Sequence, residues 1–191
     1  VGGTGGHDHP PGAGCTPLPA GGRDLSPRPG PGSAGGRSGP ILVRIVGTGL
    51  IGASLGMALS RKGLRVSRDD PSPTAAALAR YLGAGVLASE MVGAPDLIVV
   101  AAPPDVVADV VGRELLRWPD AVVTDAASVK GSVLKALQGK GLDLSRYVGS
   151  HPMAGREKSG AVAARVDVFR GRSWGVAPGP DASSGASGVV G

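Results

Sequence analysis

The sequence has few aromatic residues, one cysteine and no long apolar run, and each shortage argues against a class of protein. Only 3% of the 191 residues are aromatic, which leaves little for stacking on bases despite a formal charge of +5. A single cysteine, Cys15, cannot form a disulfide framework or a metal cluster. Apolar stretches such as 97–104 are far shorter than the roughly 20 residues of a membrane helix. We therefore expect a soluble, cytoplasmic protein that binds neither nucleic acid nor membrane.

Glycine and proline, in contrast, are abundant and concentrated near the two ends. Residues 1–40 are mostly Gly, Pro, Ser and Arg, a composition that cannot bury enough apolar surface to offset the entropy of ordering, so we expect a disordered tail. Residues 178–191 resemble a flexible linker. His7 and His9 have no third ligand at a suitable spacing, so no metal site is expected. Residues 41–177, about 137 in number, have the length of one domain.

The pattern GxGxxG, typical of a dinucleotide-binding turn, occurs twice, as GPGSAG at 30–35 and GTGLIG at 47–52. With 34 glycines in the chain, about one copy is expected by chance. Only GTGLIG follows a β-branched apolar run, at 41–46, and precedes apolar residues at helical spacing, at 51–59. We therefore assign the nucleotide turn to 47–52 and treat 30–35 as low-complexity sequence.

Strands and helices alternate along the rest of the chain. Apolar or β-branched runs predict strands, and stretches with helical period lie between them. The predicted strands are 41–46, 64–70, 86–88, 96–102, 121–127, 146–152 and 172–178, and the predicted helices are 51–59, 71–82, 104–118, 128–138 and 155–170. This alternation predicts an α/β fold, a doubly wound parallel sheet of the Rossmann type, with ligands bound at the carboxyl ends of the strands.

The glycine turn and the strand ends supply the candidate cofactor contacts. Gly47 permits the tight turn, Gly49 lets the backbone approach a pyrophosphate, and Gly52 lets the helix pack against the strand. The free N–H groups of the helix N-terminus suit an anion. A purely structural turn is the alternative. The residues predicted to contact the cofactor are Gly47, Gly49, Leu50, Ile51, Gly52, Asp70, Ala102, Pro103 and Ser128.

Asp70 lies about 20 residues after the glycines, where a carboxylate can accept hydrogen bonds from the adenosine ribose and would repel a 2′-phosphate. This placement favours NAD over NADP. Two alternatives stay open: Asp69 takes the role if the register differs by one residue, and Arg68 contacts a 2′-phosphate. A further alternative is that Asp70 is only a solvated turn carboxylate without a ligand.

The segment GSHPMAGREKSG at 149–160 is the most specific sequence motif in the chain. Together with GTGLIG, AAPP at 101–104 and DAASVKG at 125–131, it closely resembles prephenate dehydrogenase, including the arogenate dehydrogenases. The resemblance covers residues 41–178. It implies NAD-dependent oxidative decarboxylation of prephenate or arogenate in tyrosine biosynthesis: a hydride leaves ring C4 for the nicotinamide and carbon dioxide leaves C1.

The resemblance also implies roles for single residues. His151 matches the catalytic histidine, which takes the proton of the ring hydroxyl, and Ser128 matches a serine that hydrogen-bonds near this hydroxyl and the nicotinamide. Glu157 matches a glutamate of an ionic gate over the substrate pocket. Asp125 and Lys130 belong to the same motif as Ser128, but we assign them no step of the reaction. For His151 the alternative is a histidine that caps a strand end, and for Ser128 a helix N-cap.

The resemblance further implies a helical second domain that forms the dimer and supplies an arginine for the substrate carboxylate. We find no such segment in the sequence, so we expect the 191-residue chain to bind NAD and to turn over prephenate slowly or not at all. A homodimer is expected only with that domain. Two rival functions remain: another Rossmann hydroxy-acid dehydrogenase or reductase, and a non-catalytic NAD-binding module.

Overall fold

A computed structural model of the chain describes residues 2, 41–154 and 160–190. The predictions made for the tail at 1–40, which includes the glycine pattern at 30–35, lie outside the described residues apart from residue 2. The same is true of Glu157.

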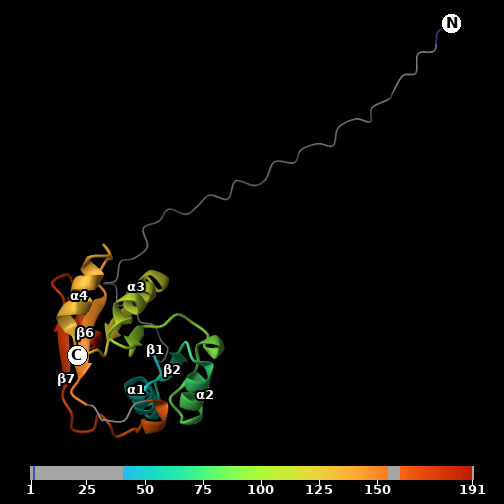
Figure 1. Ribbon diagram of the computed structural model, residues 1–191, viewed down its shortest axis with the longest axis vertical. Helices are drawn as coiled ribbons and strands as arrows, with labels where there is room; N and C mark the ends of the chain where they lie inside the picture. Colours follow the sequence, from blue (N-terminus) through green and yellow to red (C-terminus); the bar gives the residue numbers. More distant parts are fainter. Residues whose placement is uncertain (1, 3–40, 155–159, 191) are drawn as a thin grey trace. The chain divides into compact units, whose positions relative to one another are not determined.

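The described residues contain a seven-stranded sheet, whose strands lie in the order β3-β2-β1-β4-β5-β6-β7 (Figure 1). The first six strands in the sequence are parallel, and β7 is antiparallel to β6. This order, 3-2-1-4-5-6 for the parallel strands, is that of the Rossmann fold, with its switch point between β1 and β4. The strands are β1 (Leu42–Val46), β2 (Arg65–Asp69), β3 (Val86–Leu87), β4 (Leu97–Val100), β5 (Val122–Asp125), β6 (Tyr147–Pro152) and β7 (Trp174–Pro178).

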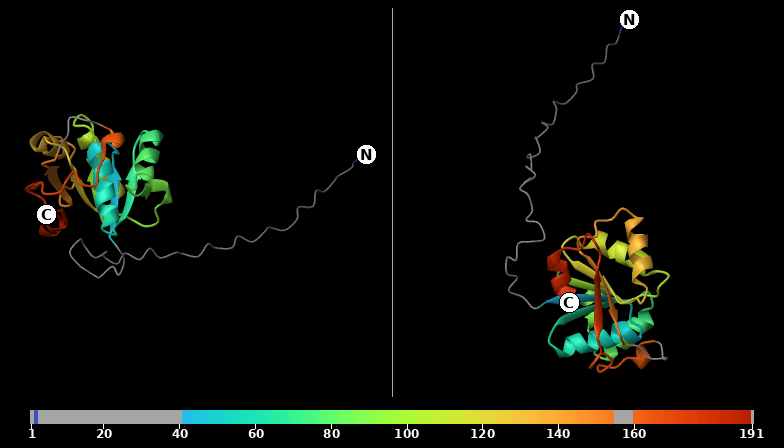
Figure 2. Two further views of the ribbon diagram at one scale, coloured as in Figure 1. Left: turned by 90° about the horizontal axis from the view of Figure 1, so that it is seen from below. Right: turned by 90° about the vertical axis from the view of Figure 1, so that its left-hand side faces the viewer.

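Helices cover both faces of the sheet (Figure 2). Apolar residues of α3 and α4 pack with β4, β5 and β6 in one cluster, and α1 packs on the other face with β1, β2 and β4 in a second. The helices are α1 (Leu50–Arg61), α2 (Pro73–Tyr81), α3 (Val107–Arg117), α4 (Lys130–Gln138) and α5 (Ser184–Val190), with 3₁₀ turns η1 (Ala88–Glu90) and η2 (Ala161–Ala163). None of the helices in the described residues is long and apolar enough to cross a membrane.

The local sequence explains most of these elements. All five residues of β1 are buried, as an apolar strand between two helical layers requires. Helix α2 begins where Ser72 accepts a hydrogen bond from the N–H of Ala75 at 3.3 Å, with Pro73 at the first helical position. The fold class predicted from the sequence is confirmed, and the predicted parallel succession holds for β1 to β6; for the strand predicted at 172–178 it is wrong, because β7 runs antiparallel to β6.

The predicted helix at 155–170 is wrong in its described part. Between residues 160 and 170 the only helical element is the turn η2, in which Ala161 is buried against alanines of α1 and α2. The N–H of Arg165 donates to Ser54 Oγ of α1 at 3.0 Å instead of to a carbonyl of its own segment. Packing on α1 and α2 therefore replaces the helix that the local pattern suggested.

The linker predicted at 178–191 is wrong as well, because residues 184–190 form α5. Ser183 holds the start of this helix: its N–H donates to Ser145 O at 2.8 Å, and its hydroxyl accepts from the N–H of Ala186 at 3.1 Å. Ala186 is buried, and α5 packs on β5, β6 and β7. A Gly/Ser-rich segment thus becomes helical through one cap and tertiary packing, which composition does not report.

Candidate functional site

The turn at 47–52 joins β1 to α1, as the sequence predicted, and its first and last glycines are required by space. Gly47 has φ +97°, and a Cβ there would lie 2.4 Å from the carbonyl oxygen of Ala101. A Cβ at Gly52 would lie 2.0 Å from the carbonyl oxygen of Gly47. No other residue type fits either position without displacing backbone, so the chain passes close to β4 at this point.

Gly49 differs from its neighbours because a Cβ there would have no heavy atom within 4 Å. Helix α1 has no side-chain cap and no acidic residue in its first turn. The N–H of Ala53 donates a hydrogen bond to Gly49 O at 2.9 Å. The N–H groups of the residues that precede Ala53 in the helix have no acceptor within it. The turn therefore presents free donors, at the positive end of a helix, to an open space, which suits a phosphate group.

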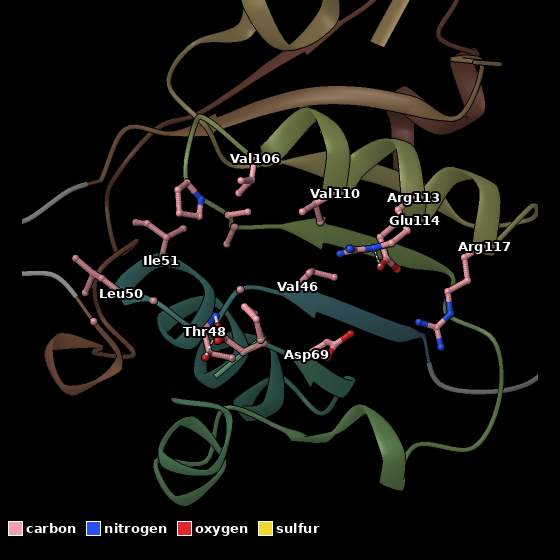
Figure 3. Close-up of a pocket in the computed structure, with 18 residues that line it drawn as sticks. Val46, Thr48, Leu50, Ile51, Asp69, Val106, Val110, Arg113, Glu114 and Arg117 are labelled. Atoms are coloured by element: carbon pink, nitrogen blue, oxygen red, sulfur yellow. Dashed lines mark hydrogen bonds and ion pairs between the residues drawn. The ribbon is translucent and has the colours of Figure 1, made fainter. Parts of the chain in front are cut away.

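That open space is a cleft of about 1030 Å³ at the carboxyl ends of the strands. Along one wall, Figure 3 shows Val106, which precedes α3, and Val110, Arg113, Glu114 and Arg117 of α3; Asp69 lies on the opposite side of β1. Of the predicted cofactor contacts, the cleft is lined by Gly47, Gly49, Leu50, Ile51, Asp70, Ala102 and Pro103. Gly52 is buried behind the turn, and Ser128 is not among the residues that line the cleft.

Asp70 follows the last residue of β2 and is bonded to the glycine turn. Its Oδ2 accepts hydrogen bonds from the N–H and the hydroxyl of Thr48, at 2.7 and 2.8 Å, and its Oδ1 accepts from the N–H of Ser72 at 2.8 Å. An ionised carboxylate has about four acceptor positions, so Asp70 can accept from a ligand hydroxyl as well. The turn and the acidic residue thus form one rigid unit.

Arg44 forms an ionic network that the sequence analysis missed. This arginine lies in the middle of β1 with 3% exposure; its Nε donates to Glu114 Oε2 of α3 at 2.9 Å, and its Nη2 donates to Asp69 Oδ2 at 2.5 Å. Burial opposes the charge, but the hydrogen bonds and charges of Glu114 and then Asp69 outweigh burial and raise the pKa of Arg44. An arginine inside a buried strand is itself a signal that carboxylates face it.

Arg68, considered above as a contact for a 2′-phosphate, points away from the cleft. It is 1% exposed, and its guanidinium donates to the carbonyl oxygens of Ala76, at 2.8 Å, and Gly85, at 3.0 Å. Because β2 places alternate side chains on opposite faces, Arg68 faces α2 whereas Asp69 reaches the cleft. The Arg68 alternative is therefore wrong for this arrangement.

His151 lies in the last part of β6, and Ser128 lies in the turn between β5 and α4. His151 is half-buried, and its Nδ1 faces the carbonyl oxygen of Ala126 at 3.5 Å. Ser128 is exposed; α4 begins at Lys130 and its N-cap is Val129, so the predicted Ser128 N-cap is wrong. Both residues lie at the edge of the sheet that carries the glycine turn, but neither is among the residues that line the cleft.

Comparisons with known proteins point to one family. A family model described as the nucleotide-binding domain of prephenate dehydrogenase matches residues 55–186. A probable prephenate dehydrogenase of Streptomyces niveus is 43% identical over 142 residues, which is 73% of this chain and 39% of the relative. The chain thus spans well under half the length of this relative.

Solved structures give the same result. A prephenate dehydrogenase from A. aeolicus, in complex with hydroxyphenyl propionate and NAD⁺, matches with a TM-score of 0.69 and 25% identity over 81% of this chain and 56% of that one. An arogenate dehydrogenase from Synechocystis matches with a TM-score of 0.67 over 75% of this chain and 52% of that one; at 22% identity this likeness shows the fold alone.

We predict that Arg44→Met destabilises the protein by about 3–5 kcal/mol, because the change leaves the Glu114 carboxylate buried without its cation. The double variant Arg44→Met/Glu114→Gln is expected to recover part of this loss. The free energies of unfolding come from urea titrations of the two single variants and the double variant. If the loss of unfolding free energy in the double variant equalled the sum of the losses in the two single variants, Arg44 and Glu114 would not interact, which would contradict the prediction.

Proposed function

Because the chain belongs to the prephenate dehydrogenase family, we propose that it binds NAD and serves the NAD-dependent oxidative decarboxylation of prephenate to 4-hydroxyphenylpyruvate. This reaction belongs to tyrosine biosynthesis. The observation that carries the proposal is the turn at 47–52, whose free N–H groups and open side at Gly49 face the 1030 Å³ cleft at the switch point of the sheet.

The cleft fits a dinucleotide in size and in chemistry. The N–H groups at the start of α1 would hold the pyrophosphate, and a side chain at residue 49 would project into the same open space. Asp70, whose carboxylate is already fixed by Thr48, would accept hydrogen bonds from the adenosine ribose. Val106, just before α3, and Val110 of α3 would offer an apolar surface to the adenine. The carboxylates of Asp69, the last residue of β2, and of Asp70, the next residue, would oppose a 2′-phosphate, which favours NAD over NADP.

The chemical step requires a hydride acceptor and a base. NAD, when bound, accepts the hydride that leaves C4 of the substrate ring. The Nε2 of a neutral His151 accepts the proton of the ring hydroxyl as the carbonyl develops, a role suited to an imidazole near pH 7. Ser128 donates a hydrogen bond near the same hydroxyl and helps to orient it. Loss of carbon dioxide from C1 then gives the aromatic product.

The remaining parts of the site lie beyond the described residues or beyond this chain. Glu157, as an ionic gate over the substrate, stays a proposal because it lies outside the described residues. Dimerisation is proposed only for a protein that includes the remaining length of the relatives, since this chain spans 39% of the S. niveus protein. The choice between prephenate and arogenate also depends on that remaining part.

Two other functions are separated from this one by assay. A hydroxy-acid dehydrogenase of the same fold would reduce NAD with a hydroxy acid and not with prephenate. A non-catalytic module would bind NAD but give no prephenate-dependent NADH, even when the chain is joined to the remaining part of the S. niveus relative. The appearance of NADH with prephenate, arogenate or a hydroxy acid as donor therefore distinguishes all three.

Asp70→Asn is expected to weaken NAD binding about 10- to 100-fold, because a hydrogen bond to a charged group contributes about 1.5–3 kcal/mol. Binding of NADP should fall less, since the charge that opposes its 2′-phosphate is removed. Calorimetric titration of the chain with each nucleotide measures both effects, and Asp181→Asn, outside the cleft, is the matched control. If Asp69→Asn lowered the affinity for NAD more than Asp70→Asn did, Asp69 and not Asp70 would be the residue that contacts the ribose.

His151→Asn is expected to lower turnover of prephenate by about 10²–10⁴-fold, as for removal of a general base, with little change in NAD affinity. The assay follows NADH at saturating substrate in the chain joined to the remaining part of its relative. His7→Asn, a histidine outside the motif, is the control. Turnover that survives the loss of His151 would show that another group takes the proton.

A further inference from the structure

The carboxylate of Asp125 is the centre of a buried polar network next to His151. Asp125 ends β5 with no exposed surface. Its Oδ1 accepts hydrogen bonds from the N–H of Ala127, at 2.9 Å, and from the ammonium of Lys130, and its Oδ2 accepts from the hydroxyl of Tyr147 at 2.7 Å. These three donors come from the turn after β5, from α4 and from β6. One side chain therefore ties three elements together.

The main-chain oxygen of Asp125 extends the network to the residue just before His151. The hydroxyl of Ser150 donates to this oxygen at 2.9 Å, and the hydroxyl of Thr124 donates to Ser150 Oγ at 2.9 Å. Thr124 and Ser150 are buried. Tyr147 and Ser150, both in β6, thus hold Asp125 at two places along the strand that leads to His151.

Glycine at position 149 makes room for this arrangement. A Cβ at Gly149 would lie 3.1 Å from Lys130 Cδ and 3.3 Å from the Tyr147 hydroxyl, so a side chain there would push the lysine away from Asp125. Burial lowers the pKa of Lys130, against the opposing effect of Asp125, and burial with the Asp125 charge raises that of Tyr147, which keeps the phenol a neutral donor. A buried ion pair contributes little net stability, so we assign this pair a positioning role.

The turn held in this way places a backbone carbonyl beside the imidazole. The carbonyl oxygen of Ala126, the residue after Asp125, lies 3.5 Å from His151 Nδ1. A carbonyl oxygen can only accept a hydrogen bond, so a neutral His151 can donate across this contact only when its proton is on Nδ1. The lone pair then lies on Nε2, which is free to take a proton from a substrate.

We propose that Asp125, held by Lys130 and Tyr147, positions the Ala126 carbonyl against His151 and thereby sets the imidazole in its Nδ1–H tautomer with Nε2 as the proton acceptor. Asp125, Lys130 and Tyr147 are then positioning residues that need not touch the substrate. The use of Nε2 rests on the proposed function, whereas the tautomer itself does not. The proposal also explains why Asp125 and Lys130 occur in the same short motif as Ser128.

The test is nitrogen-15 NMR of the imidazole in the 191-residue chain. The sequence contains three histidines, so a His7→Gln/His9→Gln background leaves His151 as the single imidazole. Well above the ordinary histidine pKa of about 6.5, the spectrum should show Nδ1 protonated and Nε2 unprotonated. Tyr147→Phe and Lys130→Met should each shift the population toward the Nε2–H tautomer. The exposed residues Tyr81 and Lys62 provide controls, because Tyr81→Phe and Lys62→Met should leave it unchanged.

An Nε2–H tautomer in the unsubstituted network would overturn the proposal, and so would folded Tyr147→Phe and Lys130→Met variants with an unchanged tautomer. If these variants do not fold, Ser150→Ala is evaluated in the same way; it removes the bond to the main-chain oxygen of Asp125 and the bond that Thr124 donates, and leaves the Asp125 carboxylate with its three donors. The proposed function fails separately: a chain with the Nδ1–H tautomer but no prephenate-dependent NADH when joined to the remaining part of its relative would contradict the reaction and leave the positioning intact.

Discussion

Close backbone approach at one turn is the constraint on which the rest of the structure depends. The carbonyl of Ala101, at the end of β4, and the carbonyl of Gly47 itself occupy the space where Cβ atoms of residues 47 and 52 would lie. Helix α1 consequently begins directly against the sheet, at the point where the strand order reverses. An apolar sheet, a helix dipole and an open cleft meet there because no side chain intervenes.

Charge is organised around this turn in two separate networks. Near the proposed adenosine end, Arg44 links Glu114 of α3 to Asp69 of β2, and Thr48 links the turn to Asp70. Near His151, Asp125 links the turn after β5 to α4 and β6. Both networks are anchored in strands, which hold side chains more rigidly than loops do. The backbone thus provides the phosphate site, and the two networks fix the acidic and basic groups on either side of it.

The sequence predicted the parts whose signals are local. A buried apolar run, a glycine turn and a helical period identify β1, residues 47–52 and α1, and alternation identifies the parallel sheet. Arg44 and Glu114 are 70 residues apart and meet only through the sheet and α3, so no local pattern reports their pairing. Helix α5 and the turn at 161–163 depend on tertiary packing for the same reason, and the Ser128 cap was misplaced because α4 begins two residues later, at Lys130. The proposed ribose contact of Asp70 and the roles of His151 and Ser128 stay predictions.

The most direct measurement of the central claim is a calorimetric titration of NAD into the chain and into Gly49→Ala, with Gly188→Ala as control. A Cβ at either glycine meets no protein atom within 4 Å, so neither change should alter the fold. We predict saturable binding to the chain and to Gly188→Ala, and a loss of at least about tenfold in Gly49→Ala, where the new methyl group would occupy the place of the pyrophosphate. Equal affinity in all three proteins, or no binding to the unsubstituted chain, would contradict the account.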